Sequence, residues 1–330
     1  MVEWESEGIG MIHPLWQRYP DVHRQLEATQ ALLQARTQLR DPQINALVQA
    51  QVTAGGKMLR SGLMFMLARL HHVDNRQLIH AAAAIEALHL ATLVHDDVLD
   101  GAATRRGQAT VHPSAGNRSA IYAGDFLFSV YFDLLADAAP DVADVGVNAR
   151  AMRRIFLGEL DQNSAPRGAA LTIHQYLRQI AGKTAALFAL ATYQGMRLAD
   201  GTEAELVASY RYGRLLGMAF QLQDDLLDFT GDHRLAKPRL EDLENGIYTL
   251  PVLYALQAKP ALATTFAAAQ HDPAAKATAA REIRALGVPQ ALQLATRYTQ
   301  KAEAALQAFP ASPERADLVH LTHALLNRHQ

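Results

Sequence analysis

Hydrophobic residues recur every three or four positions along most of the chain from about residue 22 onward. Runs of β-branched residues that alternate with polar ones, the pattern of a strand, are scarce, so the sequence predicts an almost entirely helical protein. Four segments are apolar around much of their circumference, as is typical of helices inside a large bundle. They span residues 79–100, 120–139, 184–199 and 203–231.

Short breaks rich in glycine and proline separate the expected helices. They lie at residues 41–42, 55–56, 101, 112–113, 116–117, 166–168 and 231–238. None is long enough to join two domains, and the chain has no repeat of solenoid length. From about residue 258 the sequence is alanine-rich and keeps a helical period. We therefore predict an all-α fold, with one domain at residues 22–330 after an N-terminal extension at residues 1–21.

The composition narrows the function classes. Apolar residues make up 49% of the chain, and the net charge is -2. A nucleic-acid-binding protein is expected to carry a basic excess, so no nucleic-acid partner is predicted. The chain has no cysteine, which excludes disulfides, thiolate metal sites and cysteine nucleophiles, and which is compatible with the cytoplasm. Early glutamates argue against a signal peptide, and Glu86 and His89 interrupt the most apolar run, so no transmembrane helix is expected.

One acidic pattern occurs twice, as DDVLD at residues 96–100 and DDLLD at residues 224–228. On a helix, aspartates four residues apart lie about 40° apart around the axis, so the outer pair of each copy faces one side. Like charges at this spacing destabilise a helix by about 0.2–0.5 kcal/mol per pair. A hard divalent cation such as Mg²⁺ would relieve that repulsion. One copy alone could be a solvated helix end, but two copies in apolar sequence favour a metal site.

Cationic residues stand at the breaks, where they could meet phosphate oxygens. Each alone is typical of a solvated surface charge, and His89 alone is typical of a core histidine. His89 nevertheless lies seven residues before Asp96 and thus near the same helix face. Together with the acidic segments, these residues predict a pocket for two phosphorylated ligands. The cations are Lys57, Arg60, Arg105, Arg106, Lys183 (followed by Thr184) and Lys237.

Eight motifs follow one another along the chain: GGKMLR (55–60), LHLATLVHDDVLD (88–100), TRRG (104–107), YAGDFLF (122–128), GEL (158–160), KTAALF (183–188), GMAFQLQDDLLD (217–228) and KPRLEDLENGIYTLP (237–251). With these motifs in this order, the sequence resembles the family of the trans-polyprenyl diphosphate synthases over about residues 22–328. The resemblance implies a helical bundle of the isoprenoid synthase type with a central substrate cavity. The chain resembles the medium- and long-chain enzymes, such as the catalytic subunit of hexaprenyl or heptaprenyl diphosphate synthase.

The resemblance also implies roles for individual residues. About three Mg²⁺ ions would bind at Asp96, Asp100, Asp224 and Asp228, and Asp97, Asp225 and Lys183 would complete the catalytic set. Isopentenyl diphosphate would contact Lys57, Arg60, His89 and Arg106. An allylic diphosphate such as farnesyl diphosphate would contact Arg105, Lys183, Thr184, Gln221 and Lys237.

Four positions depart from the family's pattern. Met58 replaces an arginine, Ala236 and Leu240 replace glycines, and Ile247 replaces a lysine. Since the cations of the first motif are Lys57 and Arg60, the change at Met58 is minor. The changes near Lys237 place a metal or diphosphate contact there in doubt.

The residues before the first acidic segment suggest the product length, because in the family bulky side chains there stop the growing chain. Ala91 and Thr92 occupy these positions. Since Ala84, Ala87 and Ala91 share one helix face, we expect a product longer than geranylgeranyl, of about six to eight isoprene units (about C30–C40), for a quinone side chain. Close helix packing is the alternative role for these alanines.

Several alternatives stay open at this level. The enzyme could be a homodimer, or a catalytic subunit that needs a small, unlike regulatory subunit. Release of a long product could need contact with a membrane surface. A shorter-chain farnesyl or geranylgeranyl diphosphate synthase, a metal-dependent phosphohydrolase using His95-Asp96, and a terpene cyclase are the other readings.

Overall fold

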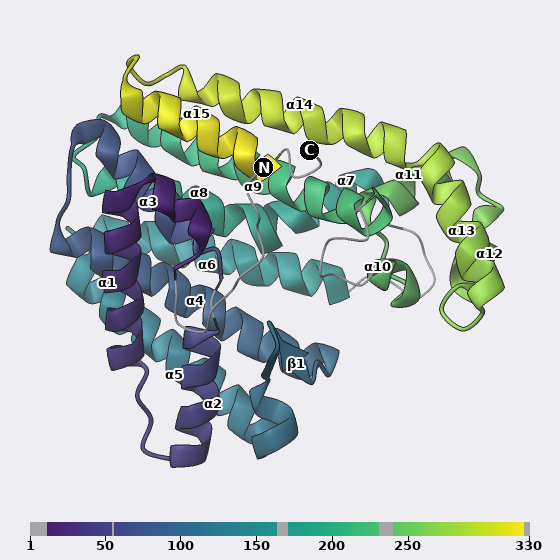
Figure 1. The fold of residues 1–330 in the computed structure, drawn as a ribbon, viewed down its shortest axis with the longest axis horizontal. Helices are drawn as coiled ribbons and strands as arrows, with labels where there is room; N and C mark the ends of the chain where they lie inside the picture. Colours follow the sequence, from purple (N-terminus) through teal and green to yellow (C-terminus); the bar gives the residue numbers. More distant parts are fainter. Residues whose placement is uncertain (1–11, 55, 164–170, 231–239, 327–330) are drawn as a thin grey trace. The chain divides into compact units, whose positions relative to one another are not determined.

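The computed structural model describes residues 12–54, 56–163, 171–230 and 240–326 (Figure 1). Most of them are helical, and the strands among them, β1 (Thr104–Arg105) and β2 (Gln108–Ala109), have two residues each. The all-α prediction is confirmed. The helices are η1 (Pro14–Arg18), α1 (Pro20–Arg36), α2 (Pro42–Thr53), α3 (Leu59–Ala68), η2 (Arg69–His71), α4 (Arg76–Asp100), α5 (Val111–Ala138), α6 (Val142–Asn163), α7 (Ile173–Ile180), η3 (Ala181–Ala185), α8 (Ala186–Arg197), α9 (Glu203–Thr230), α10 (Glu241–Glu244), α11 (Leu250–Ala258), α12 (Leu262–Ala268), α13 (Pro273–Leu286), α14 (Val288–Leu306) and α15 (Pro313–Leu326).

The chain divides into two compact units. Unit 1 contains the described residues up to Asn148 together with Ala191–Leu206, and unit 2 contains Ala149–Leu190 and the described residues from Val207 onward. Helices α6, α8 and α9 each supply residues to both units. The first acidic segment belongs to unit 1 and the second to unit 2. The domain limits expected from the sequence, at residues 1–21 and 22–330, stay a prediction.

Helix α4 runs beside α5 in unit 1, where α1 and α3 also contact it (Figure 1). The side chain of Asn75 caps its start by accepting a hydrogen bond from the backbone N–H of Leu78 at 2.9 Å. Gly101 ends it with a φ of 66°, a left-handed conformation that glycine adopts without steric cost. The predicted helix end at Gly101 is therefore confirmed, and it fixes where the first acidic segment stands.

Helices α4 and α5 are long and apolar enough, by length and composition alone, to cross a membrane. Core helices of folded domains meet the same criteria. The apolar windows of the two helices are 61% and 44% buried. Side chains from both helices also belong to one hydrophobic cluster, together with Val48 of α2. We therefore interpret both as parts of the core of unit 1.

The start of α5 differs from the sequence prediction. A break was expected at residues 112–113, yet α5 begins at Val111 and includes Pro113 in its first turn. Proline fits there because the first turn of a helix lacks intrahelical partners for its N–H groups. The expected break at Gly116 appears as a kink, with a φ of 82° inside the helix.

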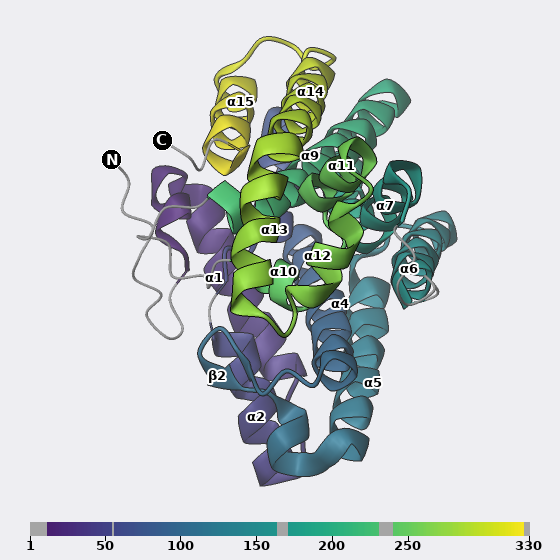
Figure 2. The same ribbon diagram turned by 90° about the vertical axis from the view of Figure 1, so that its right-hand side faces the viewer.

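Unit 2 contains the π-helical turn η3 between α7 and α8. Thr172 and Gln175 start α7 with a capping box, in which each side chain bonds the other's backbone. Helices α12 and α13 lie side by side, as do α14 and α15 (Figure 2). Among the described residues of this unit, one hydrophobic cluster surrounds Phe266 and another surrounds Leu222. The second of these clusters includes residues of α7 and α9, which carry the second acidic segment and its partners.

Candidate active site

The first acidic segment occupies the last turns of α4. Asp100 is exposed, Asp96 is half-buried, and Asp97 is only 3% exposed. Two nitrogens of Arg105 meet Oδ1 of Asp97: Nε donates at 2.8 Å, and Nη2 lies 2.7 Å away. The ion pair offsets the cost of burying the carboxylate. Arg105, expected at the allylic diphosphate, thus ties strand β1 to the helix in this structure, and the outer aspartates are the accessible ones.

A two-residue turn joins β1 to β2 and directs Arg106. Arg106 and Gly107 have φ values of 49° and 71°, and two consecutive positive values are typical of a type I′ hairpin turn. The guanidinium of Arg106 lies against Gly56, where an added methyl group would be 2.5 Å from Nη1. A larger residue at position 56 would therefore make the end of the Arg106 side chain move. The hairpin sends Arg105 to the acidic segment and Arg106 to the glycine–lysine loop.

The charge of Arg106 acts on two neighbouring groups, Arg60 and His89. Burial lowers the pKa of Arg60 to about 10; the charge of Glu86 opposes this shift, and that of Arg106 adds to it. Burial, followed by the charges of Arg60, Arg106 and Arg105, holds the pKa of His89 well below its usual value. His89 is therefore neutral at pH 7 and has one donor and one acceptor nitrogen.

The backbone of Lys57 is held by Trp16, a contact the sequence did not reveal. The indole Nε1 of Trp16 donates to the carbonyl of Lys57 at 2.6 Å. Its ring covers Gly62 so closely that an added methyl group would lie 2.1 Å from a ring carbon. Trp16 is fully buried, although it belongs to the segment expected to be an extension. Met58 precedes α3 with a φ of 41°, a conformation uncommon for residues other than glycine.

The expected chain-length residues are core residues of α4. Ala84, Ala87 and Ala91 are at most 1% exposed, and Ala91 packs with side chains of α5. Thr92 is half-buried, and its hydroxyl donates to the carbonyl of His89 at 2.8 Å. The alanines thus serve close packing. Their role in product length stays a prediction.

The second acidic segment lies near the end of α9, and the middle one of its three aspartates is buried, as in the first segment. Asp225 is 4% exposed. Its Oδ1 accepts from Nε2 of Gln221 at 3.0 Å, and its Oδ2 accepts from the backbone N–H of Leu250 at 3.2 Å and from the hydroxyl of Tyr176. Burial raises the pKa of Asp225 to about 6, although the hydrogen bonds from Tyr176, Gln221 and Leu250 oppose the shift.

The outer aspartates of this segment, Asp224 and Asp228, are half-buried. Oδ1 of Asp228 accepts from the backbone N–H of Glu241 at 3.0 Å. Oδ2 of Asp228 is buried, with no hydrogen-bond partner within the described part of the chain. Burial raises the pKa of this carboxyl. A buried acceptor without a donor is costly, and a cation is one way to satisfy it.

The turn η3 presents Lys183 and Thr184. Nζ of Lys183 pairs with Glu159 at 3.0 Å, and the hydroxyl of Thr184 donates to Oε1 of Gln221 at 2.8 Å. The backbones of α6 and η3 touch: a methyl group on Gly158 would lie 2.6 Å from the backbone nitrogen of Lys183. Single π-helical turns occur frequently at functional sites. Thr184 thus contacts Gln221, and Lys183 is its neighbour in η3; their role at an allylic diphosphate stays a prediction.

Two of the doubtful positions lie outside the described residues, namely Lys237 and Ala236, so their predicted roles stay predictions. Leu240 has a φ of 61°, the left-handed region that favours glycine. The family's glycine at this position therefore has a conformational reason. Ile247, which replaces a lysine, is 40% exposed.

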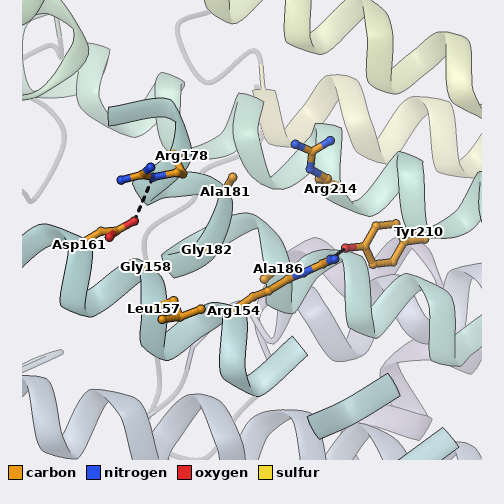
Figure 3. Close-up of a pocket in the computed structure, with 10 residues that line it drawn as sticks. All are labelled: Arg154, Leu157, Gly158, Asp161, Arg178, Ala181, Gly182, Ala186, Tyr210 and Arg214. Atoms are coloured by element: carbon orange, nitrogen blue, oxygen red, sulfur yellow. Dashed lines mark hydrogen bonds and ion pairs between the residues drawn. The ribbon is translucent and has the colours of Figure 1, made fainter. Parts of the chain in front are cut away.

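None of the predicted substrate and metal residues that the structure describes lines either of two pockets, one in each unit. A pocket of about 590 Å³ lies among α6, α7, η3 and α9 of unit 2, with Arg178 bonded to Asp161 at one end and Arg154 bonded to Tyr210 at the other (Figure 3). The second, of about 430 Å³, lies in unit 1 beside Asp41. The predicted central substrate cavity stays a prediction.

The acidic residues fit a hard cation that shares its ligands with a substrate. Within the described ranges, no three histidine, aspartate or glutamate side chains gather into a group that could hold a metal ion. Mg²⁺ is usually held by one or two carboxylates together with substrate phosphates and water, so this arrangement suits it. The lone acceptor on Asp228 and the accessible outer aspartates are oxygen ligands of the kind Mg²⁺ prefers.

Residues 41–286 match the Polyprenyl synthetase family. The chain belongs to this family. The family assignment makes it a prenyltransferase and removes the phosphohydrolase reading. Polyprenyl synthetases generally use Mg²⁺, isopentenyl diphosphate and allylic diphosphates, which agrees with the ligand classes expected from the sequence.

Two named relatives are similar over most of their length. The chain is 35% identical to heptaprenyl diphosphate synthase component 2 of Geobacillus stearothermophilus, covering 79% of this chain and 82% of that protein. It is 34% identical to octaprenyl diphosphate synthase of Escherichia coli K12, covering 86% and 90%.

Solved structures of the family have the same fold. Geranylgeranyl pyrophosphate synthase of Lactobacillus brevis superposes with a TM-score of 0.88 at 39% identity, covering 96% of this chain and 99% of that one. A polyprenyl synthase of Caulobacter crescentus, complexed with calcium and isoprenyl diphosphate, superposes with a TM-score of 0.86 at 34% identity and covers 100% of both chains.

Three residues of this polyprenyl synthetase that contact predicted site residues were not themselves predicted from the sequence. They are Trp16, Glu159 and Tyr176. Glu159 stands in the GEL segment at residues 158–160, so its place in a motif of the family was a usable signal. Trp16 and Tyr176 act through contacts 41 and 49 positions away along the chain. No local pattern shows such contacts.

Proposed function

We propose that the chain is a trans-polyprenyl diphosphate synthase that adds isopentenyl diphosphate head-to-tail to an allylic diphosphate primer. The observation that carries the proposal is the arrangement common to both acidic segments. In each, the middle aspartate is buried and bonded, while the outer aspartates are at least partly accessible. A segment that only capped a helix would not need this division.

The residues of unit 1 support an isopentenyl diphosphate site. Arg60 and Arg106 are cations, and His89 is held neutral beside them. Guanidinium groups suit phosphate oxygens because they donate in a fixed fork. We propose that these residues and Lys57 bind the diphosphate of isopentenyl diphosphate and thereby hold its double bond in place.

The residues of unit 2 support an allylic diphosphate site. Lys183 would bind diphosphate oxygens, and the oxygen atoms of Thr184 and Gln221 would face the carbon from which diphosphate departs. Bound Mg²⁺, proposed at about three ions per site, would neutralise the leaving diphosphate. The double bond of isopentenyl diphosphate then attacks the allylic carbon, and a proton is lost to the released diphosphate. No protein nucleophile is needed, which agrees with the absence of cysteine.

We propose that the product is longer than geranylgeranyl diphosphate, at about six to eight isoprene units, because small residues occupy the face of α4 before the first acidic segment. The names of the heptaprenyl and octaprenyl relatives support this length. The Lactobacillus brevis neighbour favours geranylgeranyl diphosphate as the alternative.

The assembly is part of the proposal. We expect a homodimer, and the name of the Geobacillus relative, a component 2, supports an unlike small partner as the alternative. Membrane contact during release of an insoluble product, and a cytoplasmic location, are further expectations from the sequence.

The experiment is an assay of the purified chain alone with Mg²⁺, farnesyl diphosphate and labelled isopentenyl diphosphate, followed by chromatography of the products. We expect products longer than geranylgeranyl diphosphate. A chain inactive until another subunit is added would be half of an enzyme. Inactivity under every condition, with a folded protein, would contradict the proposal. Ala91→Phe tests the length, since it should shorten the product.

A further inference from the structure

Four polar side chains of unit 2 form one continuous chain of hydrogen bonds. The hydroxyl of Thr184 reaches Gln221 at 2.8 Å, Gln221 reaches Asp225 at 3.0 Å, and the hydroxyl of Tyr176 reaches the other oxygen of Asp225. The four residues come from η3, α9 and α7. Thr184, Asp225 and Tyr176 are each less than 10% exposed, so water competes little with these bonds.

The donors and acceptors in this series of hydrogen bonds follow a fixed order, and Asp225 sets that order. The backbone N–H of Leu250 can only donate, and it meets the same oxygen as Tyr176, at 3.2 Å. A carboxylate only accepts, so Gln221 must turn its NH₂ group toward Asp225. Its carbonyl oxygen then faces Thr184, which must donate its one hydroxyl hydrogen there. The hydroxyl of Thr184 and the carbonyl oxygen of Gln221 therefore offer a neighbouring group only oxygen lone pairs.

We propose that Tyr176 and Asp225 are positioning residues that fix this direction, so that Thr184 and Gln221 present acceptor oxygens to the allylic ligand. The inference rests on the proposed function, in which positive charge develops on the allylic carbon. Oxygen dipoles held in place beforehand stabilise such charge without reorganising during the reaction. Both carboxylate oxygens of Asp225 accept hydrogen bonds, and the residue is only 4% exposed. Asp225 therefore belongs to this series of hydrogen bonds and is not a metal ligand.

Asp225→Asn is the decisive variant because it keeps the shape and reverses the direction. The asparagine oxygen would still accept from Tyr176 and Leu250, and its NH₂ group would face Gln221. Gln221 would then flip, and Thr184 would have to accept and turn its hydrogen outward. We expect kcat to fall about 10- to 100-fold, with a melting temperature close to that of the wild type because each hydrogen bond is made again.

A second substitution should restore the direction. In Asp225→Asn combined with Gln221→Glu, the carboxylate and the amide exchange places, and Thr184 again donates to residue 221. We expect most of the lost kcat to return. Gln221→Glu alone sets two carboxylates against each other and should lower the melting temperature by several degrees. The double variant should recover that loss, which tests the chain of bonds without any activity measurement.

Tyr176→Phe removes the donor at the far end. It should lower both the melting temperature and kcat, while the KM for isopentenyl diphosphate stays unchanged. Tyr254→Phe is the matched control, because Tyr254 packs against the same hydrophobic cluster as Tyr176. It should leave kcat unchanged.

Two results overturn the inference: Asp225→Asn with full kcat, or a double variant that recovers neither kcat nor melting temperature. Failure of the proposed function is a separate result. If the wild type shows no prenyl transfer, the recovery of melting temperature in the double variant can still be measured, and it still tests the hydrogen bonds.

Discussion

The two acidic segments share a sequence pattern but differ in how the protein holds them. In the first, Asp97 is paired with the cation Arg105. In the second, Asp225 is held by three uncharged donors, from Tyr176, Gln221 and Leu250. Both middle aspartates are less than 5% exposed, and both leave the outer aspartates to other partners.

The difference shows that one pattern has two structural solutions. Surroundings rich in arginine suit a site that must also hold a diphosphate, as proposed for unit 1. Uncharged donors around Asp225 fix direction without adding charge, as suits oxygens that face a developing cation. The shared pattern therefore conceals two roles that the neighbouring residues determine.

The largest expected effect concerns the outer aspartates, which the comparison treats as equivalent. Asp96→Ala and Asp224→Ala should each lower kcat by at least about 1000-fold, since each removes a carboxylate proposed as a metal ligand, and metal ions contribute several kcal/mol in the transition state. Circular dichroism should show an unchanged helical fold. Glu203→Ala, which removes an exposed carboxylate at the start of α9, is the control and should remain active. Turnover retained in either aspartate variant would end the equivalence.

The second effect concerns the difference between Asp97, which pairs with the charged Arg105, and Asp225, which is bonded to uncharged donors. In a double-mutant cycle, Asp97→Asn and Arg105→Gln should show a coupling of about 1–3 kcal/mol in the free energy of unfolding, because Arg105→Gln leaves Asp97 buried without its counter-charge. Urea unfolding of the four proteins gives the value. Additive effects would mean that Arg105 is available for diphosphate, as the sequence alone suggested.

A smaller effect follows from the burial of His89 and, after it, from the cations around this residue. The pKa of His89 is lowered in the folded state, so the unfolded chain takes up a proton first as the pH falls. The wild type should therefore lose stability as the pH falls below about 6.5, by at most about 1.4 kcal/mol per pH unit from this residue. His89→Gln should lose less over pH 7.5 to 5.5, as measured by urea unfolding. Equal slopes for both proteins would show that His89 is not shielded from protonation.

The smallest effect concerns the left-handed residues that follow the segments, which are Gly101 in unit 1 and Leu240 in unit 2. Leu240→Gly should change the free energy of unfolding by less than about 1 kcal/mol. It relieves backbone strain of about 1–2 kcal/mol but loses the packing of a partly buried leucine. Gly101→Leu has no such compensation and should destabilise the chain. Thermal unfolding of both variants measures the asymmetry.

The sequence predicted much of this arrangement because its signals are local. The helical period depends on neighbours within a few positions. The same is true of the end of α4 at Gly101 and of the outer aspartates, which share one helix face. The predicted role of Arg105 was set by its place in a motif, whereas the structure pairs it with Asp97, eight residues away.

Other contacts had no local signal. Trp16 meets Lys57, and Tyr176 meets Asp225, through contacts between segments distant in the sequence. The break expected at residues 112–113 failed for a physical reason, since proline is tolerated in the first turn of a helix. Pattern reasoning finds the reacting groups more readily than the residues that hold them.

The most direct test compares Asp224→Asn with Asp225→Asn, two neighbouring changes of equal size and charge. The account predicts that Asp224→Asn raises the Mg²⁺ concentration needed for half-maximal activity by about tenfold or more. Asp225→Asn should lower kcat and leave that concentration within about twofold of the wild type, because Asp225 directs hydrogen bonds. An Asp225→Asn enzyme whose Mg²⁺ requirement rises as much as that of Asp224→Asn would contradict the account.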